Sequence, residues 1–182
     1  MLLLWGVVLG VGVGFLRGGK IANLEDLGIR YLWLVPLSLL IQLLIFPLFT
    51  EQPVIGLATG TFHVLSYVIL ALFVIANLKV WGFIIMGSGM AANALVIGLN
   101  GGYMPSSVPS LLKSGEYEVA YHLTQAGTYG NVIHMNSSTA FEFLGDWLYL
   151  PRWIPFSTAF SLGDLLIAVG LVFFFGAGMV KG

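Results

Sequence analysis

The chain has 182 residues, of which 58% are hydrophobic and only 8% are charged, and its formal net charge at pH 7 is −1. Soluble domains carry about 25% charged residues, so this chain has more apolar surface than a soluble core of its size can bury. The balanced charge excludes a basic surface for nucleic acid, and the absence of cysteine excludes disulfides and thiolate sites. The composition therefore predicts an integral membrane protein whose first partner is the lipid bilayer.

Five apolar stretches approach the roughly 20 residues that a membrane-spanning helix needs. They cover residues 2–16, 31–49, 61–78, 81–99 and 160–180. The first resembles a secretory signal, but its first positive charge, Arg17, follows the apolar run and no small-residue cleavage site comes after it. We therefore expect a retained helix. The sequence predicts an all-α fold, a polytopic membrane bundle of about five transmembrane helices that forms one integral membrane domain over 1–182.

The positive charges predict how this bundle is oriented. With five spans, only Lys113 and Arg152 fall on one side of the membrane, and the other side receives Arg17, Lys20, Arg30, Lys79 and Lys181. The positive-inside rule then places the N-terminus outside and the C-terminus in the cytoplasm of a multi-pass protein of the bacterial cytoplasmic membrane. The segment 100–159 is accordingly expected to be extracytoplasmic.

The predicted helices carry several polar or small-residue patterns. Glycines at four-residue spacing in the first helix, Gly6, Gly10, Gly14 and Gly18, predict close helix packing. His63 opens the third helix, either as an interfacial hydrogen-bonding group or as a ligand. In the fourth helix Asn93 and Asn100 are seven residues apart and share a face. An amide inside a membrane needs a protein partner, so Asn93 either bonds a neighbouring helix or orients a functional group.

The segment 100–159 is too long for a simple connection and too aromatic for disorder. It opens with the turn sequence NGGYMP and continues with a predicted short amphipathic helix within 106–130 and a polar loop, 131–138, containing His134. Thr139 and Glu142 have the spacing of a capping box, which predicts a short helix carrying Asp146. The aromatic residues that follow are interrupted by prolines and are expected to lie in the membrane interface.

Two acids, Asp146 and Asp164, bracket that aromatic segment. An aspartyl hydrolase needs two carboxyl groups that share one proton, so that one acts as base and the other as acid. The structural alternatives remain open here. Ser161 and Asp164 have the spacing of a helix cap, which also suits a carboxylate in the first turn, and Asp146 could pair with Arg152.

Three motifs together, NGGYMP (100–105), TAFEFLGDW (139–147) and FSLGDLLIAVG (160–170), resemble a bacterial membrane-protein family known as domain of unknown function 5317. This resemblance extends over most of the chain. It implies a family without implying an activity.

A local resemblance concerns the C-terminal part, which is similar to the lipoprotein (type II) signal peptidases. Asp146-Trp147 looks like the first catalytic Asp of that family and FSLGD (160–164) like the second, with Ser161 where the family has Asn. The resemblance implies a catalytic Asp146–Asp164 dyad on the extracytoplasmic side. It also implies a membrane-anchored peptide or lipoprotein as substrate.

We therefore expect an aspartyl peptidase-like membrane enzyme that needs no metal and no cofactor. Its catalytic residues would be Asp146 and Asp164, and its substrate-positioning residues Asn93, Asn100, Ser161 and His134. The alternative is a non-enzymatic membrane protein: a small carrier, an assembly factor, or a haem- or ligand-binding protein using His63 with His122 or His134.

Overall fold

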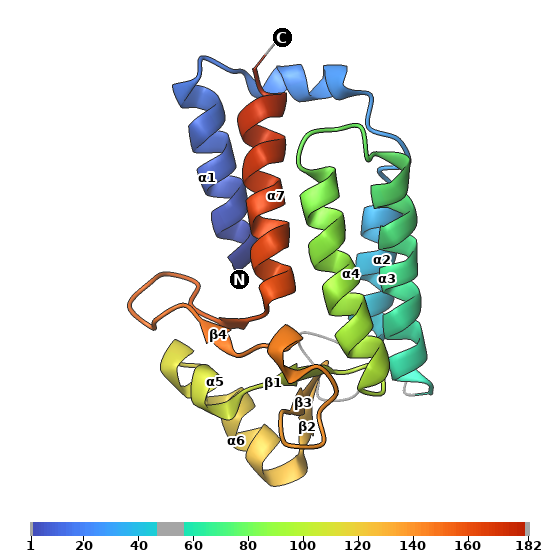
Figure 1. Cartoon of the computed structure of the whole chain (residues 1–182), viewed down its shortest axis with the longest axis vertical. Helices are drawn as coiled ribbons and strands as arrows, with labels where there is room; N and C mark the ends of the chain where they lie inside the picture. The colour runs from blue at the N-terminus through green and yellow to red at the C-terminus, as the bar shows by residue number, and fades with distance from the viewer. Residues whose placement is uncertain (1, 47–56, 181–182) are drawn as a thin grey trace.

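A computed structural model describes residues 2–46 and 57–180. Five apolar helices run side by side along the long axis of the molecule (Figure 1). They are α1 (Leu2–Leu16), α2 (Leu34–Ile45), α3 (Thr59–Ala76), α4 (Phe83–Leu99) and α7 (Leu162–Gly178). Each predicted apolar stretch thus corresponds to one helix, and α3 begins and ends two residues earlier than the predicted stretch 61–78. The last residues of the second stretch, 47–49, and the cation Lys181 lie outside the described residues.

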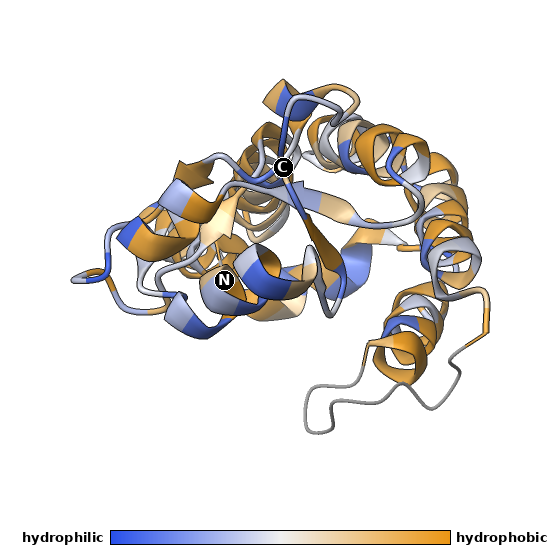
Figure 2. Ribbon diagram, turned by 90° about the horizontal axis from the view of Figure 1, so that it is seen from below, coloured by the Kyte–Doolittle hydropathy of each residue, from blue (hydrophilic) through white to orange (hydrophobic). Residues whose placement is uncertain are grey.

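These helices form a row in which each packs against the next, in the order α1, α7, α4, α3, α2. Seen end-on, the row is curved (Figure 2). Because the row is one helix thick, large apolar side chains remain exposed along its length, among them Leu9 on α1, Leu72 on α3 and Leu95 on α4. Exposed apolar surface of this extent marks a region that contacts lipid or other protein.

Among the described helices, α3 alone is both long and apolar enough to cross a membrane by itself. The pair formed by α1 and the 3-10 helix η1 (Ile21–Leu27), bent by 101°, passes the same test only if it is taken as one span, while α2, α4 and α7 are apolar but shorter. The fold is therefore mostly helical with one clear candidate span. Helix length and composition do not by themselves establish the five spans predicted from the sequence.

Small residues set the spacing between the helices. Gly6 and Gly10 of α1 lie directly against the α7 backbone at Ala168 and Leu171, which confirms the packing role predicted for these two glycines, whereas Gly18 lies beyond α1 with nothing close to it. On the other side of α7, Gly163 meets Gly89 of α4. The central helix α7 is thus held between α1 and α4 at distances that a side chain at these glycines would prevent.

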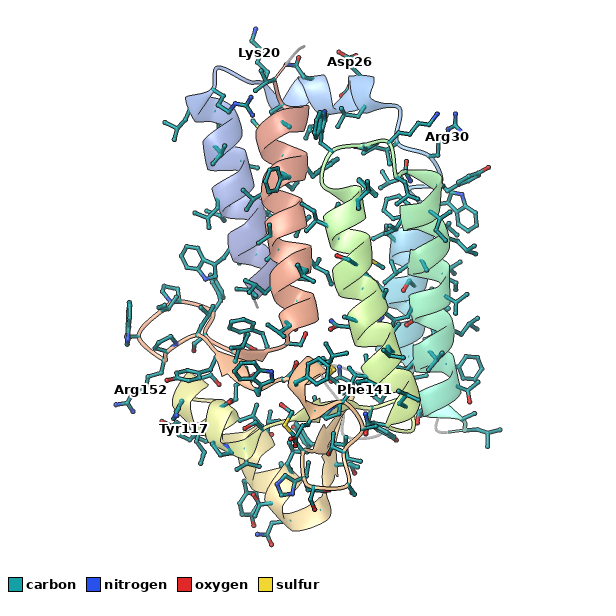
Figure 3. The ribbon with its side chains drawn as sticks, in the orientation of Figure 1. Lys20, Asp26, Arg30, Tyr117, Phe141 and Arg152 are labelled. Atoms are coloured by element: carbon teal, nitrogen blue, oxygen red, sulfur yellow. The ribbon has the colours of Figure 1, made fainter. Side chains whose placement is uncertain are left out.

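The ends of the helices away from the segment 100–159 are joined by polar bonds. The Arg17 guanidinium donates to the Gly176 carbonyl at 2.8 Å and the Asn23 amide to the Met179 carbonyl at 2.7 Å, so both satisfy the C-terminus of α7. Lys20 and Arg30 lie at this same end (Figure 3). The positive charges of the first loop are therefore gathered at one end of the row.

The segment 100–159 forms a compact cap at the other end of the row (Figure 1). The prediction of an all-α chain is wrong in this cap, which contains two small sheets. Its elements are β1 (Met104–Ser106), α5 (Val108–Ser114), α6 (Tyr117–Ala126), β2 (Thr128–Tyr129), β3 (Val132–His134), η2 (Glu142–Leu144), β4 (Leu148–Tyr149) and β5 (Ala159–Phe160). The first sheet has the order β1-β3-β2 with β1 parallel to β3, and β4 pairs with β5 in antiparallel fashion.

Two local predictions for the cap are corrected. The polar loop expected at 131–138 contains β3, because the β-branched pair Val132 and Ile133 pairs with β1. The capping box expected from Thr139 to Glu142 does not form. The Thr139 hydroxyl accepts instead from the backbone N–H of Asn136 at 2.9 Å, and η2 has no side-chain cap. Asp146 consequently follows the short helix in extended backbone.

The aromatic segment forms a hairpin between β4 and β5. Its loop reaches the start of α1, where the Trp5 indole donates to the Pro155 carbonyl at 3.0 Å. Trp153 in the loop is 78% exposed, and Trp147 before it is also exposed. Within the loop, the Arg152 guanidinium donates to the Tyr117 hydroxyl of α6 at 3.4 Å (Figure 3).

Candidate functional site

The N-terminus of α7 carries the most highly bonded of the candidate residues. Asp164 forms a capping box with Ser161: its backbone N–H donates to the Ser161 hydroxyl at 2.9 Å, and its carboxylate accepts from the Ser161 backbone N–H at 3.3 Å. The predicted cap is therefore confirmed. Such a cap satisfies two free donors at the start of the helix and places a negative charge at the positive end of its dipole.

The neighbouring helix α4 supplies the next partner. Asn93, only 2% exposed, donates from its amide to the second Asp164 oxygen and accepts from the Ser161 hydroxyl, both at 2.8 Å. The prediction that Asn93 faces protein is confirmed. The Tyr67 phenol on α3 also interacts with the Asn93 side chain, so three helices converge on these polar groups. We name Asn93, Ser161 and Asp164 the α7 cap cluster.

Replacing Asn93 with Leu should lower the free energy of unfolding by about 2–3 kcal/mol. The change strands an oxygen of Asp164 and the Ser161 hydroxyl, and each buried group left unsatisfied costs about 1–3 kcal/mol. Thermal unfolding in detergent measures the effect. Ser88→Ala on the same helix is the control, since Ser88 is exposed and bonds only within α4. An Asn93→Leu variant as stable as the Ser88→Ala control would contradict this account.

Asp146 is positioned by β1, which directly follows the NGGYMP turn. Its backbone N–H donates to the Pro105 carbonyl at 2.8 Å, its carbonyl accepts from Ser107 at 2.9 Å, and it forms a parallel bridge with Ser106. The turn itself needs glycine: Gly102 has φ +89 and lies against the α3 backbone at Gly60. The turn therefore brings β1, and with it Asp146, back to the base of the helices.

Ser106 is a site residue that the sequence did not indicate. It is 1% exposed, and its hydroxyl and the Asp146 Oδ1 are buried atoms without a hydrogen-bond partner within the described residues. Residues paired between adjacent strands share a sheet face. The register pairs Ser106 with Asp146 on one side and with His134 on the other, so the three lie in one row. A buried serine after a proline has no distinguishing pattern in a sequence.

The environment of Asp146 raises its pKa well above the usual Asp value. Burial of the carboxyl group is the main cause, followed by the negative charges of Asp164 and Glu116. Part of the Asp146 side chain still reaches the surface, but Oδ1 does not. Asp146 and Asp164 are therefore close enough to influence each other electrostatically. No ion pair between Asp146 and Arg152 forms in the part of the chain that the structure describes, which corrects that structural alternative.

The raised pKa of Asp146 predicts a pH dependence of stability. The folded protein binds this proton more tightly than the unfolded chain, so the contribution of Asp146 to stability is fully present below the ordinary Asp pKa of 3.8 and is lost as the pH rises through the folded pKa. The slope has an upper limit of roughly 1.4 kcal/mol per pH unit. Asp146→Asn should flatten this part of the profile in melts between pH 4 and 8, whereas Glu142→Gln should leave it unchanged. An unchanged profile in the Asp146→Asn variant would contradict the assignment.

The remaining candidates have other partners. Asn100 binds the backbone of Ala140 with both its amide and its carbonyl, each at 3.0 Å, and so ties the cap to the end of α4. His63 is buried and bonds the Gly102 carbonyl at 2.6 Å, and its ring packs on Phe46 and Tyr67. His122 stacks on a tyrosine of β2. Within 2–46 and 57–180, no three His, Asp or Glu side chains are grouped as metal ligands.

The structure defines a mostly helical protein with one clear candidate membrane span and a small mixed cap at one end of its helix row. Residues 26–176 match the model of a family of unknown function, DUF5317, so the chain belongs to that family. It is also 32% identical, over 116 residues, to an uncharacterized protein of Thermotoga maritima. That alignment covers 61% of this chain and 60% of the relative. No solved structure matches the chain, and the resemblance to type II signal peptidases finds no support in these comparisons.

Proposed function

We propose that this protein is a multi-pass membrane protein with an aspartyl hydrolase site on the extracytoplasmic side. The membrane part of the proposal rests on the surface of the helix row. The shorter helices α4 and α7 each have 17 residues, which is the lower limit of about 17 residues for a span. The exposed aliphatic side chains on both faces of the row suit lipid better than water.

Exposed aromatic residues at both ends of the row support the same proposal. Trp and Tyr concentrate where a bilayer meets water. At the end away from the cap the exposed rings include Tyr31, Trp33 and Trp81, and in the cap segment they include Trp147, Trp153 and Phe156. Two aromatic belts separated by aliphatic helices are the pattern of a protein that crosses the whole membrane.

The orientation is tested by single cysteines, since the chain contains none. Glu118→Cys in the cap should react with an impermeant maleimide added to intact cells, whereas Glu25→Cys at the opposite end should react only after lysis. Both side chains are exposed, so accessibility to solvent is matched. Labelling of the Glu25 position from outside would reverse the orientation and move both aspartates to the cytoplasmic face.

The single observation that carries the catalytic part is the contrast between the two aspartates. Asp164 accepts hydrogen bonds on both carboxylate oxygens, the arrangement of an ionised acceptor. The raised pKa of Asp146 favours its protonated form. An acid and base pair requires two neighbouring carboxyl groups whose environments differ, so that one stays protonated while the other is ionised.

The chemistry assigns one role to each group. Asp164 takes a proton from water, whose oxygen bonds to the substrate carbonyl carbon, while Asp146 gives its proton to the carbonyl oxygen. The tetrahedral diol then collapses: Asp164 passes its proton to the departing nitrogen and Asp146 recovers the proton of the diol. One water is consumed, and an acid and an amine are released. Ser106, with its unpartnered hydroxyl beside Asp146, would orient the water or the carbonyl oxygen.

The test uses purified protein in lipid nanodiscs and quenched fluorogenic peptides with an N-terminal acyl chain, which represent a membrane-anchored peptide or lipoprotein. The proposal expects cleavage by the intact protein. Absence of cleavage across an acylated library of all P1 side chains, between pH 4 and 8, would reject it.

A non-enzymatic membrane protein is the second candidate. The observation in its favour is the completeness of the α7 cap cluster, in which Asn93, Ser161 and Asp164 satisfy one another. Under this candidate the cluster serves only to join α7 to α4. Stability changes in the cluster variants without any hydrolysis by the intact protein would favour it.

A further inference from the structure

An apolar groove lies between α3 and α4. It encloses about 310 Å³, and its lining includes the small residues Ala71, Gly87, Ala91 and Ala94. Ser88 also lines it, but the Ser88 hydroxyl bonds the carbonyl of Ile85 and adds no free polar group. The groove therefore offers a cavity of ligand size without hydrogen-bonding groups along its length.

The groove has the length of a short acyl chain. Along α4 it extends from Ile84 to Ala94, which at 1.5 Å per residue is about 15 Å. A single extended acyl chain fills such a space. A helix about 10 Å wide and of the same length would need on the order of 1,200 Å³ and does not fit within it.

One end of the groove reaches the candidate site. Tyr67 and Ala94 line this end, and Ala94 directly follows Asn93, whose side-chain amide donates to the Asp164 carboxylate at 2.8 Å. Asn93 also packs against Gly163, in the first turn of α7. This end of the groove therefore lies beside the start of α7, where the helix row meets the cap.

We propose that the groove binds one acyl chain of a lipid-linked substrate, with the lipid attachment held at Tyr67 beside Asp146 and Asp164. This proposal rests on the proposed function, because the bound lipid is a substrate only if the protein is a hydrolase. A substrate would then reach the site by lateral diffusion within the bilayer. The protein would select it by its lipid anchor as well as by the groups near the bond that is cleaved.

A photoactivatable phospholipid tests the groove directly. Phosphatidylglycerol with a diazirine midway along one acyl chain is incorporated into nanodiscs with the intact protein, irradiated, and located by peptide mass spectrometry. Labelling should concentrate on groove residues at least 5-fold over the equally apolar exposed surface at Leu72 and Leu95. Ala91→Phe, which fills the groove, should remove this excess, and Leu95→Phe, outside the groove on the same helix, should preserve it.

Several outcomes would overturn the proposal. One is equal labelling of all exposed helix faces, and another is groove labelling that persists in Ala91→Phe. A third is a disulfide between the Ile75→Cys side chains of two copies in a protein whose groove is not labelled, because the groove would then be covered by a second copy and not by lipid. If Ala91→Phe does not fold, Ala71→Phe on α3 repeats the test from the opposite wall. The measurement does not depend on hydrolysis. Groove labelling without hydrolysis would support the groove and reject the enzyme, whereas cleavage of unacylated and acylated peptides with equal KM would reject the groove alone.

Discussion

Asp146→Asn and Asp164→Asn should each lower hydrolysis of the acylated peptides by at least about 1,000-fold, and the double variant should be no slower than either single variant. Residues that act on one reaction as a unit give strongly non-additive losses. In the proposed mechanism, neither the acid nor the base can work without the other. The measurement is kcat at saturating peptide in nanodiscs, with kcat/KM recorded alongside.

The controls separate chemistry from folding. Glu142→Gln removes an exposed acid from the same cap and should keep full activity. Asp146→Asn should fold, because an amide resembles the protonated carboxyl that its raised pKa favours. Asp164→Asn places an amide N–H₂ against the Asn93 amide or the Ser161 N–H and should lose about 1–3 kcal/mol of stability, which thermal unfolding of the variant measures. Single variants that keep full activity would contradict the dyad. So would an experimental structure with the two carboxyl groups more than about 8 Å apart and no bridging water, because such groups cannot share a proton.

The helices of the row could be predicted from the sequence because their signal is local. A run of apolar residues such as 162–178 identifies a helix whatever it packs against, and Ser161 with Asp164 marks its start through chemistry within three residues. The close approach of α1 to α7 was also predictable, because the glycines of α1 recur at the spacing that places them on one face.

The cap could not be predicted in the same way, because long-range pairing decides its structure. Strands of two or three residues carry no periodic pattern, and β1 forms only because β3 and the backbone of Asp146 pair with its two sides. The same pairing creates the row of His134, Ser106 and Asp146. The partnership of Asn93 with Asp164 spans 71 positions, so the sequence indicated that Asn93 needs a partner without indicating which one.

Gly163→Ala should destabilise the protein by about 3–5 kcal/mol. A Cβ at Gly163 would lie 2.6 Å from the Gly89 carbonyl oxygen and would also overlap the Asn93 side chain. Neither neighbour can yield. The Gly89 oxygen belongs to the α4 backbone, and Asn93 is fixed by its bonds to Ser161 and Asp164.

The matched control for that change is Gly98→Ala on α4, where a Cβ would meet nothing within 4 Å. Removing a glycine from a helix without a collision should stabilise the protein by about 0.5–1 kcal/mol, because the unfolded chain loses more freedom than the helix does. Melting temperatures in one detergent compare the two alanine variants directly. The two changes in melting temperature should have opposite signs. Both substitutions add one methyl group, and they differ only in whether a neighbouring helix packs against the glycine. Equal and small effects would mean that α4 and α7 do not touch at Gly163, and the α7 cap cluster, which depends on that contact, could not form as described.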